Sequence, residues 1–458
     1  MGWRYYNEIK MQLYPYQKEG ARFLLEKGSG LLADSVGLGK TIQTIAVLKE
    51  TRAFPTLILC PAILKWQWKE ELKLWLPDAE VVVISGNASE RKDDWNTPAD
   101  IYIANYELLL HDLPIISGRM WETMVCDEAT RISNCWTKTY RALYNIKAMR
   151  RIALTGTPVS NRPNEIWGII NWCYPGILGK YVAFIDRYCI RNIWGGIFSF
   201  QRLDELQSRI KPLMIRRLQE EVLPELPPKV VSEVHFILSD KERELYDKIR
   251  KELLFEIEKE LMDKIENPIT IQQTLVKMLR LQQITDHPQL LGSKSIGATK
   301  LEVLRELLGE LEGKKIILFT KFSTMAELLR KELMSAQPLL VTGDVPNDKR
   351  QAIIEDFEGR NGGALLIMTS AGMFGLNLQT ASVVIHYDSE WSLAKMTQRE
   401  GRAHRIGQKE NVLIYHLIGK RTIDEYVRKV LHKKQQLSKD ILGDGVGAEE
   451  IKQMLRYD

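Results

Sequence analysis

Hydrophobic and polar positions divide the chain into short apolar runs separated by helical patterns. Each run is rich in valine, isoleucine and leucine, is too short for a buried helix, and is apolar at successive positions, which is typical of strands buried on both faces. Strands that alternate with helices indicate parallel sheets covered by helices on both sides. Two groups of five runs therefore predict an α/β protein with two lobes. The runs are Thr56–Cys60, Val81–Ser85, Ile101–Tyr106, Thr123–Cys126, Arg151–Leu154, Lys315–Thr320, Leu339–Thr342, Ala364–Thr369, Val383–Tyr387 and Val412–Leu417.

The stretch 160–300 has a different pattern. Ser239 and Glu242 form a capping-box sequence, and apolar residues then follow at every fourth position from 245 to 265, which predicts a helix. A second helix is expected from Ile269 to Thr285. The three prolines in Leu223–Lys229 exclude a helix there and indicate a linker. The sequence therefore predicts a helical insertion between the two lobes.

Composition narrows the class of protein. The chain has 458 residues, of which 45% are hydrophobic and 27% charged, and these values exclude a disordered chain, a collagen-like fibre and a disulfide scaffold. The net charge of +5 lies entirely in the last 68 residues, which hold 14 lysines and arginines against 9 acidic residues. This excess indicates either a basic tail on an ordinary enzyme or a binding surface for a polyanion, and charge alone does not decide between them.

Five cysteines form no C-x-x-C pair, which argues against a zinc module or disulfide framework and for a reducing compartment. The first residues contain no apolar signal region, and no apolar run approaches the length of about 18 residues that a membrane span needs. We therefore expect a soluble protein without a membrane partner, cytoplasmic if bacterial or viral (nucleoid or host cytoplasm) and nuclear if eukaryotic.

Asp34–Thr41 is a candidate phosphate-binding loop. It lies between an apolar run and a helical pattern and matches G-x-x-x-x-G-K-[ST], with Asp34 in place of the first glycine. In such a loop Lys40 would reach the β- and γ-phosphates of ATP, and Thr41 would offer its hydroxyl to Mg²⁺. The alternative is a glycine-rich turn with an exposed lysine. The residues that would present backbone N–H groups to the nucleotide are Gly37, Leu38 and Gly39.

Asp127 and Glu128 follow a predicted buried strand. Ligands of doubly wound sheets bind at the carboxyl ends of the strands, where the phosphate loop also lies, so the two segments should meet. Asp127 would then help to hold Mg²⁺, and Glu128 would activate the attacking water. The alternative is an exposed acidic turn.

Three arginines fall within seven residues of Gln398–Gln408. Arg402 and Arg405 are three positions apart, so on a helical turn they share a face, as two groups that stabilise a γ-phosphate would. The alternatives are a solvated basic turn and simple contacts to DNA phosphates.

These three segments, in this order and in two lobes, resemble the superfamily-two helicase-like ATPases and, more narrowly, the Swi/Snf-type (Snf-two) family of DNA translocases. The resemblance extends from about Leu13 to Gln436. Its most specific segments are Gln398–Gln408, which fits Q-x-x-G-R-x-H-R-x-G-Q throughout, and Arg216–Lys229. Further matching segments are Leu13–Gly20, Leu59–Pro61 with Trp66–Gln67, Leu154–Pro158 and Thr369–Leu378.

The resemblance implies two RecA-like lobes that bind ATP and Mg²⁺ between them and double-stranded DNA across both. It makes Gln17 the adenine reader, and Arg402 and Arg405 the arginine fingers. The candidate DNA contacts are Lys65, Trp66, Lys321 and Ser370, although a packing role is the preferred interpretation of Trp66. The implied organisation is a first RecA-like lobe (1–159), its helical extension (160–222), a linker and helical protrusion (223–299), a second RecA-like lobe (300–436) and a tail (437–458).

Residues Thr380–Thr397 must supply a buried strand, a turn and the start of a helix, which leaves no residues for a strand-separating wedge. We therefore expect an ATP-dependent translocase that moves along duplex DNA without obligatory strand separation, as a monomer, with a protein partner left open. The alternatives are a helicase that separates or anneals forked or branched DNA, a hydrolysis-deficient DNA-binding scaffold, and a metabolite kinase.

Overall fold

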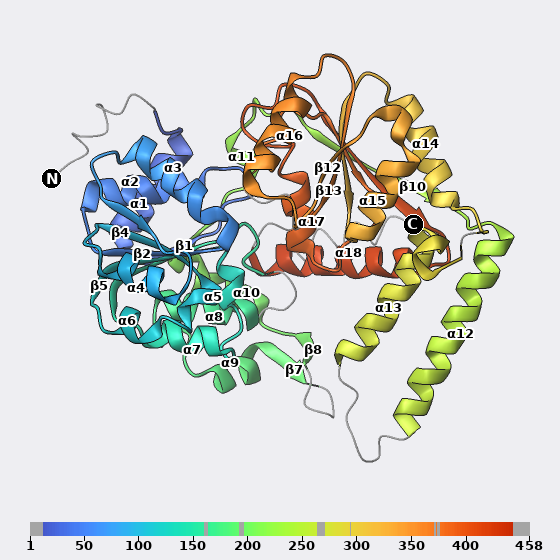
Figure 1. Cartoon of the computed structure of the whole chain (residues 1–458). Helices are drawn as coiled ribbons and strands as arrows, with labels where there is room; N and C mark the ends of the chain where they lie inside the picture. The colour runs from blue at the N-terminus through green and yellow to red at the C-terminus, as the bar shows by residue number, and fades with distance from the viewer. Residues whose placement is uncertain are drawn as a thin grey trace. The chain divides into compact units, whose positions relative to one another are not determined.

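The computed structural model describes residues 12–159, 164–191, 197–262, 271–293, 295–370, 372 and 376–442. It divides into two units, which are residues 1–224 with 434–458, and residues 225–433 (Figure 1). Each unit is built around its own parallel sheet. The two α/β lobes predicted from the apolar runs are therefore confirmed.

The first unit contains a seven-stranded parallel sheet in the order β3-β4-β2-β5-β6-β1-β9. Its strands are β1 (Gly30–Leu32), β2 (Thr56–Cys60), β3 (Val81–Val83), β4 (Ile101–Asn105), β5 (Trp121–Asp127), β6 (Ala148–Leu154) and β9 (Met214–Ile215), and β7 (Cys189–Arg191) pairs with β8 (Ile197–Phe200) in a separate antiparallel hairpin. Its helices are α1 (Pro15–Lys27), α2 (Lys40–Thr51), α3 (Lys65–Trp75), α4 (Ala88–Asn96), α5 (Tyr106–Leu109), α6 (Leu113–Ser117), α7 (Lys138–Asn145), α8 (Asn164–Cys173), α9 (Tyr181–Tyr188), α10 (Leu203–Ile210) and α11 (Gln219–Val222).

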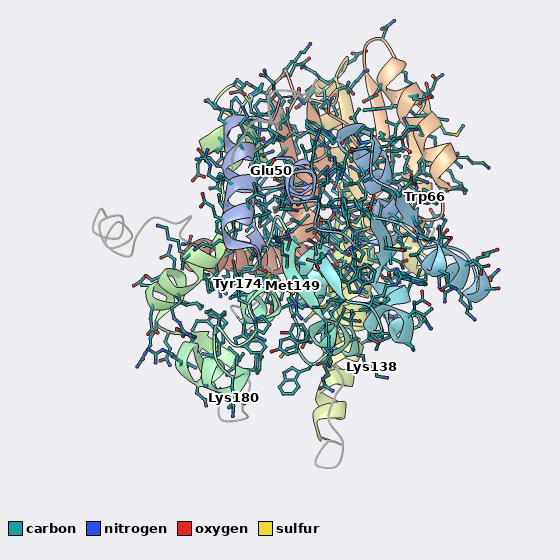
Figure 2. All side chains as sticks on the ribbon, turned by 90° about the vertical axis from the view of Figure 1, so that its left-hand side faces the viewer. Glu50, Trp66, Lys138, Met149, Tyr174 and Lys180 are labelled. Carbon is teal, nitrogen blue, oxygen red and sulfur yellow. The ribbon has the colours of Figure 1, made fainter. Side chains whose placement is uncertain are left out.

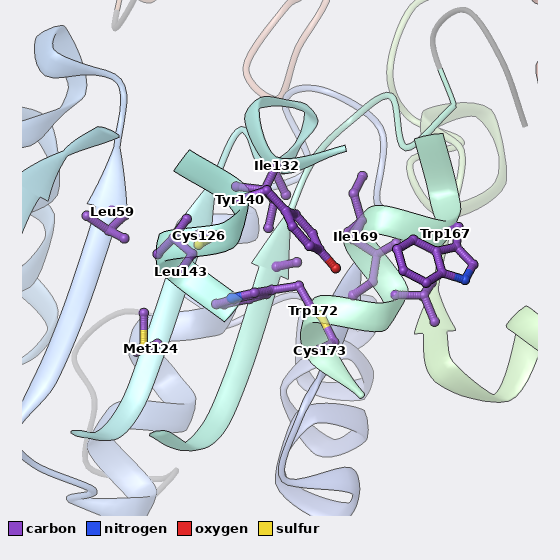
Figure 3. Packing of buried hydrophobic residues seen from close by; sticks show 14 of the residues in the cluster. Leu59, Met124, Cys126, Ile132, Tyr140, Leu143, Trp167, Ile169, Trp172 and Cys173 are labelled. Atoms are coloured by element: carbon purple, nitrogen blue, oxygen red, sulfur yellow. The ribbon is translucent and has the colours of Figure 1, made fainter. Parts of the chain in front are cut away.

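Alternate residues of the central strands enter two different cores. On β2, Leu57 and Leu59 pack in one core with side chains of α7 and α8, including Trp172 (Figure 3). Ile58 and Cys60, which point to the opposite face, pack in the other core with side chains of α1, α2 and α3. Burial on both faces explains why the strands appear in the sequence as continuous apolar runs.

The second unit contains a six-stranded parallel sheet in the order β10-β15-β14-β11-β13-β12. Its strands are β10 (Lys229–Phe236), β11 (Lys315–Thr320), β12 (Leu339–Val341), β13 (Ala364–Thr369), β14 (Val383–His386) and β15 (Val412–Gly419). Its helices are α12 (Asp240–Met262), α13 (Ile271–Asp286), α14 (Thr299–Glu310), α15 (Ser323–Glu332), α16 (Asn347–Gly359) and α17 (Leu393–Glu400), and α18 (Ile423–Leu442) begins in this unit.

The stretch between the two sets of runs is partly as predicted. Helices α12 and α13 are present, and the Glu242 carboxylate accepts a hydrogen bond from the backbone N–H of Ser239, as in a capping box. The linker expectation is wrong at its end, because Lys229 starts β10, which pairs with β15 over eight residues. Strand β10 lies at the edge of the sheet and exposes most of its residues, so it lacks the apolar run that marks the central strands.

Some expectations lie outside the described residues. These include Ile265 of the predicted helix, residues 371 and 373–375 of Thr369–Leu378, and most of the tail after residue 442. Among the helices that the structure describes, none combines the length and the apolar character needed to cross a membrane.

Candidate active site

The phosphate loop connects β1 to α2 in the first unit. Gly37 and Gly39 have φ angles of +89° and +73°, which residues with a side chain rarely adopt. A Cβ atom on residue 39 would lie 2.5 Å from the side-chain amide nitrogen of Gln17, so the Gln17 side chain would have to move. Lys40 and Thr41 are the first two residues of α2, so both lie at the helix N-terminus, where backbone N–H groups favour an anion.

Lys40 is held inside the loop. Its ammonium donates to the carbonyl oxygens of Asp34 and Ser35, at 2.7 and 3.1 Å. Burial lowers the pKa of Lys40, and the nearby carboxylates of Asp34, Glu128 and Asp127 oppose this shift. The structure therefore brings Lys40 and the acidic pair together, as the sequence predicted. A phosphate placed there would stabilise the charged lysine.

Asp34, which stands where the loop pattern has its first glycine, forms an ion pair with a buried arginine. Both carboxylate oxygens accept from the guanidinium of Arg217, at 2.9 and 2.6 Å, and one also accepts from the Gln43 amide at 3.0 Å. Arg217 donates in addition to the carbonyl of Tyr16 on α1. The buried Asp34–Arg217 pair thus ties the loop to the segment after β9.

Gln17 lies against the phosphate loop. Its side-chain amide donates to the carbonyl of Leu38 at 3.2 Å, and its side-chain oxygen accepts from the backbone N–H of Tyr14. This position beside the loop is compatible with recognition of a base, and the adenine role of Gln17 stays a prediction.

Asp127 is the last residue of β5, and Glu128 follows it. The Asp127 carboxylate accepts from the indole N–H of Trp68 at 2.9 Å and from the backbone N–H of Glu128 at 2.9 Å. Burial raises the pKa of Asp127, while these two hydrogen bonds and Lys40 favour the ionised form. Glu128 has a φ of +51°, so the chain turns sharply after the strand. The oxygen ligands of Asp127 and Thr41 are those that Mg²⁺ prefers, so these side chains fit that ion.

Trp68 is a residue that the sequence analysis missed. Lys65, Trp68, Leu72 and Trp75 form the buried face of α3, and their spacing of three, four and three residues is the signal that could have identified them. The packing role expected for Trp66 is wrong, because this side chain is 49% exposed (Figure 2). Trp68 takes that role.

The first-unit DNA candidates differ in accessibility. Lys65 is buried and donates to the carbonyl of Ile84 at 2.7 Å, so it must release this contact to reach a DNA phosphate. Trp66 is exposed, with the Lys69 ammonium 5.7 Å from its ring centroid. The structure therefore favours Trp66, and both assignments stay predictions.

The arginine segment Gln398–Gln408 begins in the last turn of α17 and continues beyond that helix in the second unit. Arg402 donates to the carbonyl of Leu376 at 3.2 Å, and Arg405 donates to the side-chain oxygen of Asn377. Both arginines therefore contact the end of the Thr369–Leu378 motif, although they lie in turns beyond the helix. His404 also contacts the carbonyl of Pro227, which joins this segment to the end of Arg216–Lys229.

The first arginine of the segment has a different role. Arg399 is fully buried and donates to the Ser370 hydroxyl at 2.9 Å, to the Asp388 carbonyl at 3.0 Å and to Glu390 at 3.2 Å. Ser370 in turn donates to Glu390 at 2.8 Å. The predicted DNA contact Ser370 is thus part of a buried network that Arg399 organises.

Lys321 borders this network. Its backbone N–H donates to the Asp388 carboxylate at 2.9 Å, and its ammonium approaches the side-chain oxygen of Gln282 at 3.4 Å. Burial lowers the pKa of Lys321. The DNA roles of Lys321 and Ser370 stay predictions.

Two family models match the chain. A model of the SNF2-related domain matches residues 16–290, and a model of the helicase conserved C-terminal domain matches residues 299–407. The first therefore covers more than half of the chain and contains the phosphate loop and the acidic pair. The second contains Arg402 and Arg405.

Several known proteins are similar over most of the chain. YwqA of Bacillus subtilis (strain 168), named for ATP-dependent helicase/translocase activity, is 33% identical over 95% of this chain and 49% of its own length. The SWI/SNF-related matrix-associated actin-dependent regulator of chromatin subfamily A member 1 of Homo sapiens is 30% identical over 97% of this chain and 46% of its own length. The chain thus spans about half the length of these relatives. A solved structure titled Sulfolobus solfataricus SWI2/SNF2 ATPase core in complex with dsDNA is 32% identical, with 97% of both chains covered and a TM-score of 0.46.

Proposed function

The chain belongs to the SNF2 family of ATP-dependent helicase-like enzymes, and from this premise we propose that it is a double-stranded DNA translocase. It would hydrolyse ATP to move along duplex DNA without obligatory strand separation. The observation that supports the proposal is that the chain contains every side chain we assign to ATP hydrolysis. Lys40, Asp127 and Glu128 meet in the first unit, and Arg402 and Arg405 lie together against one segment of the second.

The roles of these side chains follow from their chemistry. Lys40 and the N–H groups of the loop bind the phosphates, and Arg402 and Arg405 stabilise charge on the γ-phosphate. Glu128 orients and deprotonates the attacking water. Thr41 and Asp127 would hold Mg²⁺, which would neutralise charge on the phosphates. Trp68 holds the Asp127 carboxylate in place.

Translocation without strand separation is supported by the segment before the arginines. Residues 376–400, all of which the structure describes, contain one strand, β14, and one helix, α17, and the connecting residues 387–390 are buried. This part of the chain therefore has no projecting hairpin that could act as a wedge. Affinity for DNA should come mostly from phosphate contacts and should weaken steeply as salt is raised.

The test is the rate of ATP hydrolysis with no nucleic acid, with single-stranded DNA, with duplex DNA and with RNA. Glu128→Gln, which keeps the phosphate loop intact, is the blank. We expect strong stimulation by blunt duplex DNA. Stimulation by single strands or forks alone would instead favour the forked-DNA remodeller, and a rate indifferent to DNA would refute the proposal.

The arginine roles need a separate variant. Arg405→Ala should lose turnover while its affinity for duplex DNA stays close to that of the unchanged chain. A large fall in DNA affinity would identify Arg405 as a DNA contact and contradict its assignment to the γ-phosphate.

A further inference from the structure

Three side chains of the second unit converge on one face of its sheet. His386 on β14 and His416 on β15 are register partners on neighbouring parallel strands, so their side chains leave the sheet on the same face. Their imidazole rings stack with centroids 4.6 Å apart. Glu400, the last residue of α17, places a carboxylate oxygen 3.9 Å from Nε2 of His386. One ligand atom from each side chain lies within 4.8 Å of the others.

Hydrogen bonding does not account for this arrangement. Each imidazole is 1% exposed, and both nitrogens of each ring are buried without a hydrogen-bond partner among the described residues. A neutral imidazole carries one N–H donor and one acceptor, and buried groups of both kinds are almost always paired. Two adjacent rings with neither requirement met point to a ligand.

A proton shared with Glu400 is the simplest rival, and the surrounding charges oppose it. Burial, the other imidazole and the guanidinium groups of Arg399 and Arg428 lower the pKa of His386. Burial, Arg428, His432 and Arg399 likewise lower the pKa of His416, against the opposing effect of Glu233, which is paired with Arg428 at 2.7 Å. The ring nitrogens without hydrogen-bond partners among the described residues remain the observation that points to a ligand.

We propose that His386, His416 and Glu400 bind a divalent transition-metal ion of the Zn²⁺ class. Two imidazole nitrogens and one carboxylate oxygen are a ligand set that suits such ions and is a poor one for Mg²⁺. The lone pair of an imidazole nitrogen lies in the plane of its ring, so both ring planes must pass through a metal that lies about 2.1 Å from each nitrogen. The two planes are now 10° from parallel, so at least one ring must rotate out of the stack when the metal binds. A fourth position remains for water.

Such an ion would position the arginine segment. Glu400 lies two residues before Arg402, and its other carboxylate oxygen pairs with Lys229 of β10 at 3.2 Å. A metal on the first oxygen would fasten the end of α17 to β14 and β15 while Lys229 keeps the second. The proposal is independent of which nucleic acid the protein acts on.

The test is metal binding by the full chain, freed of any histidine tag, stripped with a chelator and kept free of nucleotide. Co²⁺ is the first probe, because its visible absorption reports coordination by nitrogen and oxygen, and Zn²⁺ is then used to displace it. We expect one Co²⁺ per chain. Glu400→Gln, which preserves size at a partly exposed position, and His416→Phe should each weaken binding by about 100-fold or more, since loss of a ligand should cost at least as much as loss of its supporting contacts.

The matched control is His111→Phe, which removes an exposed histidine of the first unit and should leave Co²⁺ affinity unchanged. Two outcomes would overturn the proposal. One is that the unchanged chain binds no Co²⁺ or Zn²⁺, a result that does not depend on whether any variant folds. The other is that Glu400→Gln, with an unchanged circular dichroism spectrum, binds Co²⁺ with an affinity within tenfold of that of the parent. Near-ultraviolet absorption bands typical of cysteine ligation in that complex would show that the ion binds at a different site.

Discussion

Asp34 offers a test in which the sequence pattern and the structure disagree. Asp34→Gly brings the phosphate loop closer to the general G-x-x-x-x-G-K-[ST] pattern, which alone predicts an unharmed or improved site. The structure predicts a destabilised first unit. Asp34 is fully buried and forms two hydrogen bonds with Arg217 and one with Gln43. Its removal leaves the Arg217 guanidinium with only the exposed carboxylate of Glu19, at 3.7 Å.

The magnitude follows from this burial. Removing one partner of a buried ion pair costs about 3–5 kcal/mol, because the remaining charge is left uncompensated. Arg217 keeps the side-chain oxygen of Gln43 and the carbonyl of Tyr16 as acceptors, which places the expected loss near 3 kcal/mol, the lower end of that range. Asp34→Asn keeps the shape of the side chain, so it measures the loss of the charge without the cavity that Asp34→Gly would leave.

Tryptophan fluorescence followed through a urea titration measures the stability of the first unit, which contains Asp34. Ten of the 11 tryptophans lie in residues 1–224, and Trp391 is the exception, so the fluorescence transition reports unfolding of the first unit. The control is Asp78→Asn, which breaks the exposed Arg52–Asp78 pair of the same unit and should cost less than about 1 kcal/mol. A loss for Asp34→Asn no larger than for Asp78→Asn would refute the reasoning. Adding Arg217→Met to Asp34→Asn should restore part of the loss.

Three further predictions follow from single contacts. Trp68→Phe removes a hydrogen bond that favours the ionised form of Asp127, so the pKa of Asp127 should rise. The acid limb of the ATPase pH profile should therefore move up by about one pH unit, and an unchanged limb would contradict a role of Trp68 in holding Asp127 ionised. Lys300→Met leaves two buried carboxylates, Asp286 and Asp424, without their shared cation and should lower the free energy of unfolding of the second unit by about 3–5 kcal/mol. The loss should appear in the far-ultraviolet circular dichroism transition, while the tryptophan fluorescence transition of the first unit stays at the same urea concentration. Gly20→Ala places a Cβ atom 1.9 Å from the Gln43 side-chain oxygen. It should lower the free energy of unfolding in the tryptophan fluorescence assay by about 1–3 kcal/mol, and an unchanged free energy would mean that Gln43 can move out of the way.

The sequence by itself determined the fold class and which residues are candidates for ATP hydrolysis. Strands buried on both faces have to be apolar throughout, so β2, β11 and β13 were predicted with the boundaries that the structure has. Lys40, Asp127 and Glu128 could be predicted to meet because segments at the carboxyl ends of parallel strands share one edge of the sheet. Local chemistry and topology were sufficient for both conclusions.

Only the tertiary structure decided which side chains support these residues. Arg217 lies 183 positions from Asp34, and Trp68 lies 59 positions from Asp127, so no local pattern pairs them. Strand β10 is held by its pairing with β15 across the chain, and its exposed residues carry no apolar signal. His386 and His416 became neighbours through the register of two strands. Sequence patterns express burial and backbone preference, whereas ion pairs, edge strands and ligand clusters depend on which distant segments the packed sheet brings together.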